Sequence, residues 1–166
     1  MTRSRWLWIL YVLVVLAAGV QLVCFYPQLP ERLASRFDGQ GEAMEWCSKA
    51  TFVRTNVVVF LFFALLFPVL WMILPWIPTS LIHVPHKEFW LAPARCGYAL
   101  LLIRGFLLCF GCLTLMCLAI FMQVTMRANL TARPNLGYGP WIIVGIYLAS
   151  TLGALTWFFR KPGRWF

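Results

Sequence analysis

The sequence predicts an all-α membrane protein: a bundle of four transmembrane helices whose first connecting loop is long and polar. Two properties of the whole chain lead to this prediction. Hydrophobic residues make up 62% of the 166 positions and charged residues 11%, whereas soluble domains are about 45–50% apolar and about 25% charged. Because a water-soluble fold of this length cannot bury so much apolar surface, lipid must surround much of the chain.

A third observation places the helices: four long stretches contain no Asp, Glu, Lys or Arg. A helix needs about 20 apolar residues to cross the hydrocarbon, and each stretch is that long. The polar first loop covers 27–52. We expect one membrane domain that covers residues 1–166, with helices at about 6–26, 54–76, 99–126 and 139–159.

The first stretch is expected to remain as a transmembrane helix. Its apolar run is too long for a signal peptide, and no small-x-small cleavage motif follows it. In the second stretch, Pro68 would kink the helix, and Pro75 with Pro78 would end it. In the third, the segment 105–126 is by itself about 33 Å of helix, so Arg104 is expected at the membrane edge. Four glycines could let helices approach closely: Gly105, Gly111, Gly145 and Gly153.

The basic residues indicate an orientation and exclude one class of function. The net charge is +9, but Lys and Arg are scattered between the apolar stretches, so no nucleic-acid partner is expected. Seven or eight basic residues fall on the side of the termini and six on the other side. This difference favours both termini in the cytoplasm, with membrane lipids as the partners of many of these charges.

The first loop has a predicted structure of its own. Gly39 and Gly41 tolerate a positive φ angle, which predicts a tight turn there. The flanking segments 34–38 and 43–47 could then pair as a short β-ribbon, and Ser48 could cap the second helix.

Cysteines suggest two further hypotheses. Cys24 ends the first predicted helix and Cys47 precedes the second, so a disulfide between them would close the loop in an oxidising compartment. Such a bond requires Cα atoms within about 7 Å of each other, which a sequence does not show. The pair Cys109-x2-Cys112 has redox-motif spacing but lies in the apolar centre of the third helix, where packing is the expected role.

Two loop motifs carry a family resemblance. The motif of the first loop is Leu29-Pro30-x4-Ser35-Arg36-Phe37-Asp38-x2-Gly41-x4-Trp46-Cys47-Ser48-Lys49. The motif of the second loop includes Trp90, Leu91 and Pro93. Together they resemble a bacterial multi-pass membrane family of unknown function, best known as the N-terminal domain of Sdp-type immunity proteins. That family commonly has His where this chain has Arg36, so any proton or metal role of the His is missing from this loop.

The resemblance implies a small protein of the bacterial inner membrane, and some relatives act in peptide-toxin immunity or signalling. No catalytic residue is expected, because the chain lacks a P-loop, a Ser/His/Asp set and an HExxH motif. Neither a metal nor a cofactor is expected. His83 and His86 are separated by Pro85 and lack a third ligand, and the acids of the first loop lie among basic residues that can pair with them.

The function that these observations predict is recognition by a non-catalytic membrane protein. A peptide, protein or lipid partner would contact residues of the first loop: Pro30, Arg36, Phe37, Asp38, Gly41, Trp46 and Lys49. Two alternatives stay open, an accessory structural subunit of a larger membrane complex and a small transporter. The four uncharged stretches hold no carboxylate, which argues against an ion pathway.

Overall fold

The computed structural model describes residues 2–78, 81 and 96–159. Within these residues the chain forms four long helices and one two-stranded antiparallel sheet. The helices are α1 (Thr2–Phe25), α2 (Lys49–Ile73), α4 (Cys96–Ala128) and α5 (Gly139–Phe159), and the strands are β1 (Arg32–Phe37) and β2 (Ala43–Ser48). All four helices are long and apolar enough to cross a membrane, which confirms the predicted fold class.

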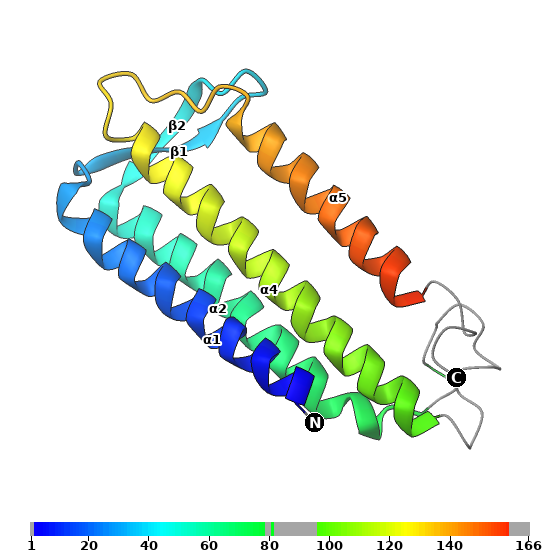
Figure 1. Cartoon of the computed structure of the whole chain (residues 1–166). Helices are drawn as coiled ribbons and strands as arrows, with labels where there is room; N and C mark the ends of the chain where they lie inside the picture. Colours follow the sequence, from blue (N-terminus) through cyan, green and yellow to red (C-terminus); the bar gives the residue numbers. More distant parts are fainter. Residues whose placement is uncertain (1, 79–80, 82–95, 160–166) are drawn as a thin grey trace.

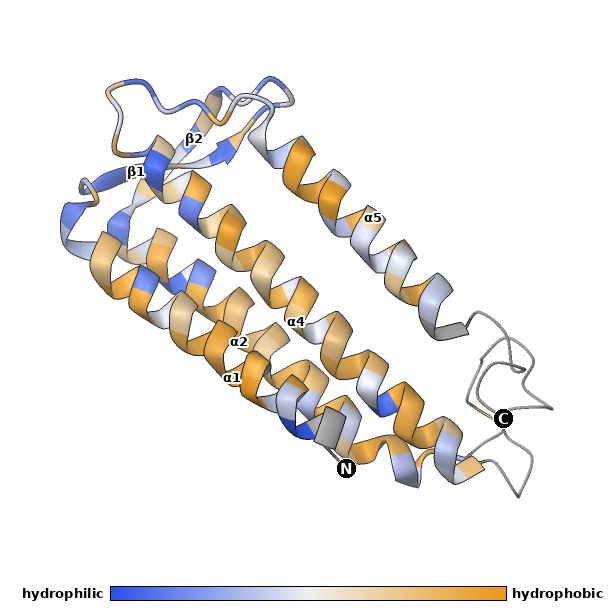
Figure 2. Ribbon diagram, viewed as in Figure 1, coloured by the Kyte–Doolittle hydropathy of each residue, from blue (hydrophilic) through white to orange (hydrophobic). Residues whose placement is uncertain are grey.

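Helix α4 is the centre of the arrangement. Figure 1 shows α1 and α2 on one side of α4 and α5 on the other, and α4 packs against all three of them. The β-hairpin covers one end of the bundle, at the same end as the segment between α4 and α5. Figure 2 shows hydrophobic residues along the helices and hydrophilic residues gathered at the hairpin end. The polar first loop therefore folds as a small structured layer above the bundle.

The core lies where α1, α2 and α4 meet. Leu108 and Leu115 of α4 are fully buried there, together with Tyr11 of α1 and Phe67 of α2. Gly111 makes this packing possible, because a Cβ at this position would lie 2.8 Å from Phe67 Cγ and 2.9 Å from Tyr11 Cε2. Of the four glycines considered above, Gly111 therefore has the close approach, and a Cβ at the other three would meet nothing within 4 Å.

Pro68 lies inside α2 and leaves one backbone carbonyl without its usual partner. In an α-helix the N–H of residue 68 would donate to the carbonyl of Ala64, but proline has no N–H. The hydroxyl of Tyr11 donates to that Ala64 oxygen at 3.0 Å, in a buried contact. A side chain of α1 thus supplies the hydrogen bond that proline removes from α2, which matters in a membrane because water is not there to supply it.

Pro75 removes a second hydrogen bond in the same way, at the end of α2. The orphaned carbonyl is that of Trp71, and Arg104 of α4 donates to it from Nε at 3.2 Å. The guanidinium carbon also lies 4.2 Å from the centre of the Trp71 ring, in cation–π geometry. The positive charge of Arg104 also interacts favourably with the negative, C-terminal end of the α2 dipole. Arg104 therefore caps the C-terminal end of α2.

We expect Tyr11→Phe to lower the free energy of unfolding by about 1–3 kcal/mol, because the Ala64 carbonyl would stay buried without a donor. In a Pro68→Ala background the same substitution should cost almost nothing, since the new residue 68 returns an N–H to Ala64. Denaturant unfolding of the four proteins in detergent micelles measures this coupling as a double-mutant cycle. Equal losses in both backgrounds would contradict the assigned role of Tyr11.

Candidate functional site

The first loop forms a β-hairpin that is docked on the helix bundle. Strands β1 and β2 pair antiparallel with Leu33 opposite Cys47 and Ala34 opposite Trp46, and the register shifts after Ala34. This confirms the predicted ribbon. Leu33 is fully buried in a cluster with Phe52 of α2 and other apolar side chains, so the face of the hairpin that carries it rests on the helices. The cap predicted at Ser48 is also present, because its Oγ accepts from the Thr51 N–H at 3.2 Å.

Asp38 shapes the turn of the hairpin. Its Oδ1 accepts hydrogen bonds from the backbone N–H groups of Gln40 at 2.9 Å and Glu42 at 2.8 Å. Gly41 follows with a φ angle of +88°, a backbone conformation that residues with a side chain rarely adopt. The turn predicted from the glycines is therefore formed by a carboxylate and a glycine acting together. The chain uses Asp38 and Gly41, two of the predicted contact residues, to build the loop.

The turn is fixed by the segment between α4 and α5. The Leu136 N–H donates to the Gly41 oxygen at 2.9 Å, and Asn135 forms an antiparallel bridge with Glu42. Trp141, in the first turn of α5, donates from Nε1 to the Gly39 oxygen at 3.1 Å. We call the hairpin 31–48 together with the segment 129–138 the polar cap. Its two halves come from distant parts of the sequence and hold each other in place.

Asn129 makes the central contact of the polar cap. Its side-chain amide accepts from the Ala34 N–H at 2.6 Å and donates to the Ala34 oxygen at 3.1 Å. The same Nδ2 also donates to the Thr125 oxygen at 3.0 Å, at the end of α4. Asn129 is 4% exposed and Ala34 is fully buried. The amide therefore pairs with the backbone of β1 as a neighbouring strand would, and joins α4 to the hairpin.

Lys49 also has a structural position. Its Nζ donates to the Leu29 oxygen at 2.9 Å and lies 4.6 Å from the centre of the Tyr26 ring. Its backbone N–H donates to the Glu31 oxygen at 2.9 Å. These contacts fix the path of the chain from α1 into the hairpin, and Pro30 stays exposed on that path. The ammonium group is directed at the protein itself.

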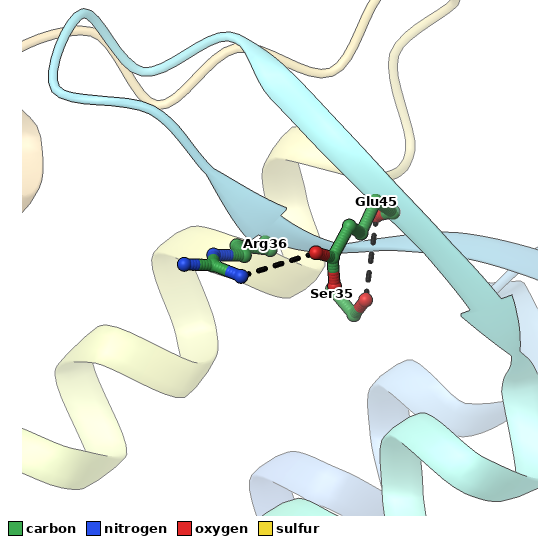
Figure 3. Close-up of polar contacts among 3 residues, drawn as sticks. All are labelled: Ser35, Arg36 and Glu45. Atoms are coloured by element: carbon green, nitrogen blue, oxygen red, sulfur yellow. Dashed lines mark hydrogen bonds and ion pairs between the residues drawn. The ribbon is translucent and has the colours of Figure 1, made fainter.

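Arg36 and Glu45 form an ion pair on the surface of the hairpin. Figure 3 shows the Arg36 Nη1 directed at the Glu45 Oε1, 3.1 Å away, and the Ser35 hydroxyl directed at the Glu45 backbone oxygen. The two charged side chains are 69% and 61% exposed. An ion pair that is so exposed adds little to stability. Arg36 is therefore available for contact with a partner in a way that Asp38 is not.

Two apolar side chains of β2 are exposed on the polar cap. Trp46 is 49% exposed and Met44 is 64% exposed. Trp46 belongs to the predicted contact residues, and Met44 does not. Phe37 of the same prediction is half-buried. Exposed tryptophan and methionine side chains are among those that protein interfaces favour.

The remaining predictions have different outcomes. Cys24 and Cys47 are free thiols in the structure, the first exposed and the second half-buried, and a disulfide between them stays a prediction. The second-loop motif of Trp90, Leu91 and Pro93 lies outside the described residues, as do His83 and His86. Across the part of the chain that is described, no cluster of three or more His, Cys, Asp or Glu side chains could hold a metal ion.

Comparison with known proteins leaves the family open. No protein-family model matches the chain, and neither a search of curated proteins nor a search of solved structures found a match. The resemblance of the two loop motifs to the Sdp-type immunity family therefore stays a prediction from the sequence.

Sequence reasoning missed the residues that join the two halves of the polar cap. Asn129 and Trp141 both lie next to the ends of apolar stretches, where polar and aromatic side chains are usual, so their residue types do not indicate a contact with the hairpin. One signal was present for Asn129, since asparagine directly after a long apolar helix is a common terminator. Its partner Ala34 carries no signal, because the contact uses backbone atoms alone.

Proposed function

We propose that this protein is a non-catalytic, multi-pass protein of the bacterial inner membrane that recognises a protein or peptide partner through its polar cap. The observation that carries the proposal is the exposure of Trp46 and Met44, 49% and 64%, on a hairpin whose other apolar face is buried on the helices. Exposed aromatic and methionine side chains beside polar groups are typical of contact surfaces.

The rigidity of the polar cap supports this proposal. The hairpin is held to the segment 129–138 by Asn129, by the Leu136–Gly41 hydrogen bond and, from α5, by Trp141. A surface that is already ordered loses less conformational entropy on binding than a mobile loop does. The bonds that fix the hairpin therefore also favour its use as a binding surface.

Charge gives the cap a preference among partners. The hairpin end of the bundle carries six basic residues, Arg32, Arg36, Lys49, Arg54, Arg127 and Arg133, and four acidic residues, Glu31, Asp38, Glu42 and Glu45. Asp38 is occupied by the turn and Lys49 by the Leu29 oxygen, and Arg36 is paired with Glu45. Among the remaining charges the basic residues are in excess: Arg32, Arg54, Arg127 and Arg133 against Glu31 and Glu42. A peptide with apolar and acidic side chains would complement the surface that remains.

Orientation and biological role enter as parts of the same proposal. The excess of basic residues in the sequence segments expected on the side of the termini favours termini in the cytoplasm and a polar cap on the outer side of the membrane. A peptide on the outer side of this membrane would then reach the cap directly. The loop resemblance to Sdp-type immunity proteins agrees with an immunity-like or signalling-like role of this kind.

The test is site-specific photo-crosslinking in cells that carry the native partner. A benzophenone side chain at Met44 should give a crosslinked protein or peptide band. The same probe at Trp76, which is 84% exposed at the other end of the bundle, serves as the control and should give none. Replacing Trp46 by Ala should weaken the interaction by about 2 kcal/mol, roughly thirtyfold in dissociation constant. Identical crosslinks from both positions, or none from Met44, would reject the proposed surface.

An accessory role in a larger membrane complex is the second candidate, and the exposure of α5 favours it. This helix packs against α4, but no residue in its most apolar 18-residue window is buried. Ile146, Leu148 and Leu152 are all more than half exposed. Such a helix could pack against lipid or against another subunit. A native gel of mildly solubilised membranes distinguishes the two, since a complex would migrate well above the size of the single chain.

A further inference from the structure

Arg104 lies at the depth of one membrane interface. From Arg104 to Arg127 the helix α4 rises about 35 Å, which is slightly more than the roughly 30 Å of hydrocarbon in a bilayer. If the apolar centre of α4 spans the hydrocarbon, these two arginines reach opposite headgroup layers. The interface at Arg104 is the one at the N-terminal end of α4, near the end of α2.

The guanidinium of Arg104 is held in a fixed orientation and uses one of its nitrogens within the protein. Nε donates to the Trp71 oxygen, and the guanidinium carbon lies 4.2 Å from the centre of the Trp71 ring. The two terminal NH2 groups, with four N–H donors, have no carboxylate near them among the described residues. The acids that the structure describes all lie at the opposite end of the bundle: Glu31, Asp38, Glu42 and Glu45.

The surroundings of Arg104 are apolar and open to lipid. Leu108, one turn further along α4, is fully buried in the core. On the side of Trp71 that faces the middle of the bilayer, α2 has exposed apolar side chains: Val69 is 49% exposed and Leu65 is 64% exposed. An acyl chain can lie along this part of α2 while its phosphate reaches the guanidinium.

We propose that Arg104 is the centre of a binding site for one phospholipid, whose phosphodiester is bound by the two terminal NH2 groups of the guanidinium. A guanidinium presents paired donors that match two oxygens of a phosphate. Phosphate is also the anion that every phospholipid places at this depth. The hydrogen bond to the Trp71 oxygen and the cation–π contact with its ring orient the guanidinium in advance, which lowers the cost of binding.

Lipid phosphate is the better source than free phosphate for two reasons. The exposed apolar side chains around Arg104 match acyl chains and offer nothing to a small hydrated ion. Arg127, which is exposed in the last turn of α4, lies over no aromatic ring among the described residues. The site at Arg104 should thus retain a lipid that Arg127 does not.

The experiment must separate lipid binding from the structural role of Arg104. Replacing Arg104 by Gln removes the donor to the Trp71 carbonyl, so it is best combined with Pro75→Ala, which returns a backbone N–H to that carbonyl. Native mass spectrometry of protein purified with phosphatidylglycerol then measures the fraction that keeps a bound lipid. We expect the fraction to fall about tenfold in the double variant relative to Pro75→Ala alone, and to stay unchanged in Arg127→Gln.

Three results would overturn the proposal. Equal lipid retention by Pro75→Ala and by the double variant would show that Arg104 does not hold the lipid. Equal retention of diacylglycerol, which has the same acyl chains without the phosphate, would show that the phosphate is not recognised. Displacement of the lipid by excess inorganic phosphate would assign the site to a free anion. Retention that depends on both Arg104 and the lipid phosphate supports the site.

Discussion

Replacing Asn129 by Leu should lower the free energy of unfolding by about 2–6 kcal/mol and free the hairpin from α4. The substitution leaves the Ala34 N–H and carbonyl, both paired with Asn129, without partners in a fully buried position. Each buried backbone group that loses its hydrogen bond costs about 1–3 kcal/mol. Leucine has the same branched arrangement of atoms but is larger than asparagine, so overpacking at this buried site adds to the loss of the hydrogen bonds.

Two further variants separate the parts of this effect. Asn129→Asp keeps an acceptor for the Ala34 N–H but loses the donor to the Ala34 oxygen, so its loss of stability should be smaller than that of Asn129→Leu. If the carboxylate stays charged while buried, the loss should instead be larger. Asn56→Leu is the matched control, because Asn56 donates to the carbonyl of Phe52 in its own helix. Unfolding in detergent and hydrogen exchange at the Ala34 amide are the measurements. A loss at Asn56 as large as that at Asn129 would contradict the account.

Gly41→Ala is the second substitution with a large expected effect. A Cβ at this position would lie 2.4 Å from the backbone nitrogen of Gly137 and 2.8 Å from its oxygen. These distances are too short, so the backbone at Gly41 or at Gly137 would have to move. The φ angle of +88° adds a conformational penalty, of about 1–2 kcal/mol for a residue with a side chain. We expect a total loss of about 3 kcal/mol or more, with separation of the hairpin turn from the segment 129–138.

The control for this prediction lies two residues away in the same turn. A Cβ at Gly39 would meet nothing within 4 Å, so Gly39→Ala should change stability by less than about 0.5 kcal/mol. Limited proteolysis of the polar cap and thermal unfolding would report both variants. If Gly39→Ala and Gly41→Ala behave alike, the close approach of Gly41 to Gly137 is not what stabilises the cap.

The fold class could be predicted because the membrane imposes simple rules on a sequence. Long apolar stretches must be helical to satisfy their own backbone, so uncharged windows locate the helices. The hairpin could be predicted for a local reason as well, since Gly41 and Ser48 act within a few residues of themselves. The predicted ends of the helices were less accurate than the predicted number of helices. Helix α2 begins at Lys49, five residues before the expected position, because the cap at Ser48 allows the charged first turns to be helical.

The contacts that join distant segments could not be predicted in this way. Tyr11 carries no signal of its own in the sequence, because its role depends on the carbonyl that Pro68 leaves without a donor in another helix. Arg104 was expected at the membrane edge, but its bond to Trp71 depends on Pro75. Each proline was interpreted for what it does to its own helix. What it requires from a neighbouring helix appears only when the helices are packed together.

The pairing of Asn129 with Ala34 has a consequence for biogenesis. The two residues are 95 positions apart, so a ribosome working at about 5–20 residues per second completes the second about 5–19 s after the first. During that interval the edge of β1 lacks the amide that later covers it. The hairpin therefore reaches its final form only after most of the polypeptide has entered the bilayer, and a truncated product would display an incomplete surface to quality-control proteases.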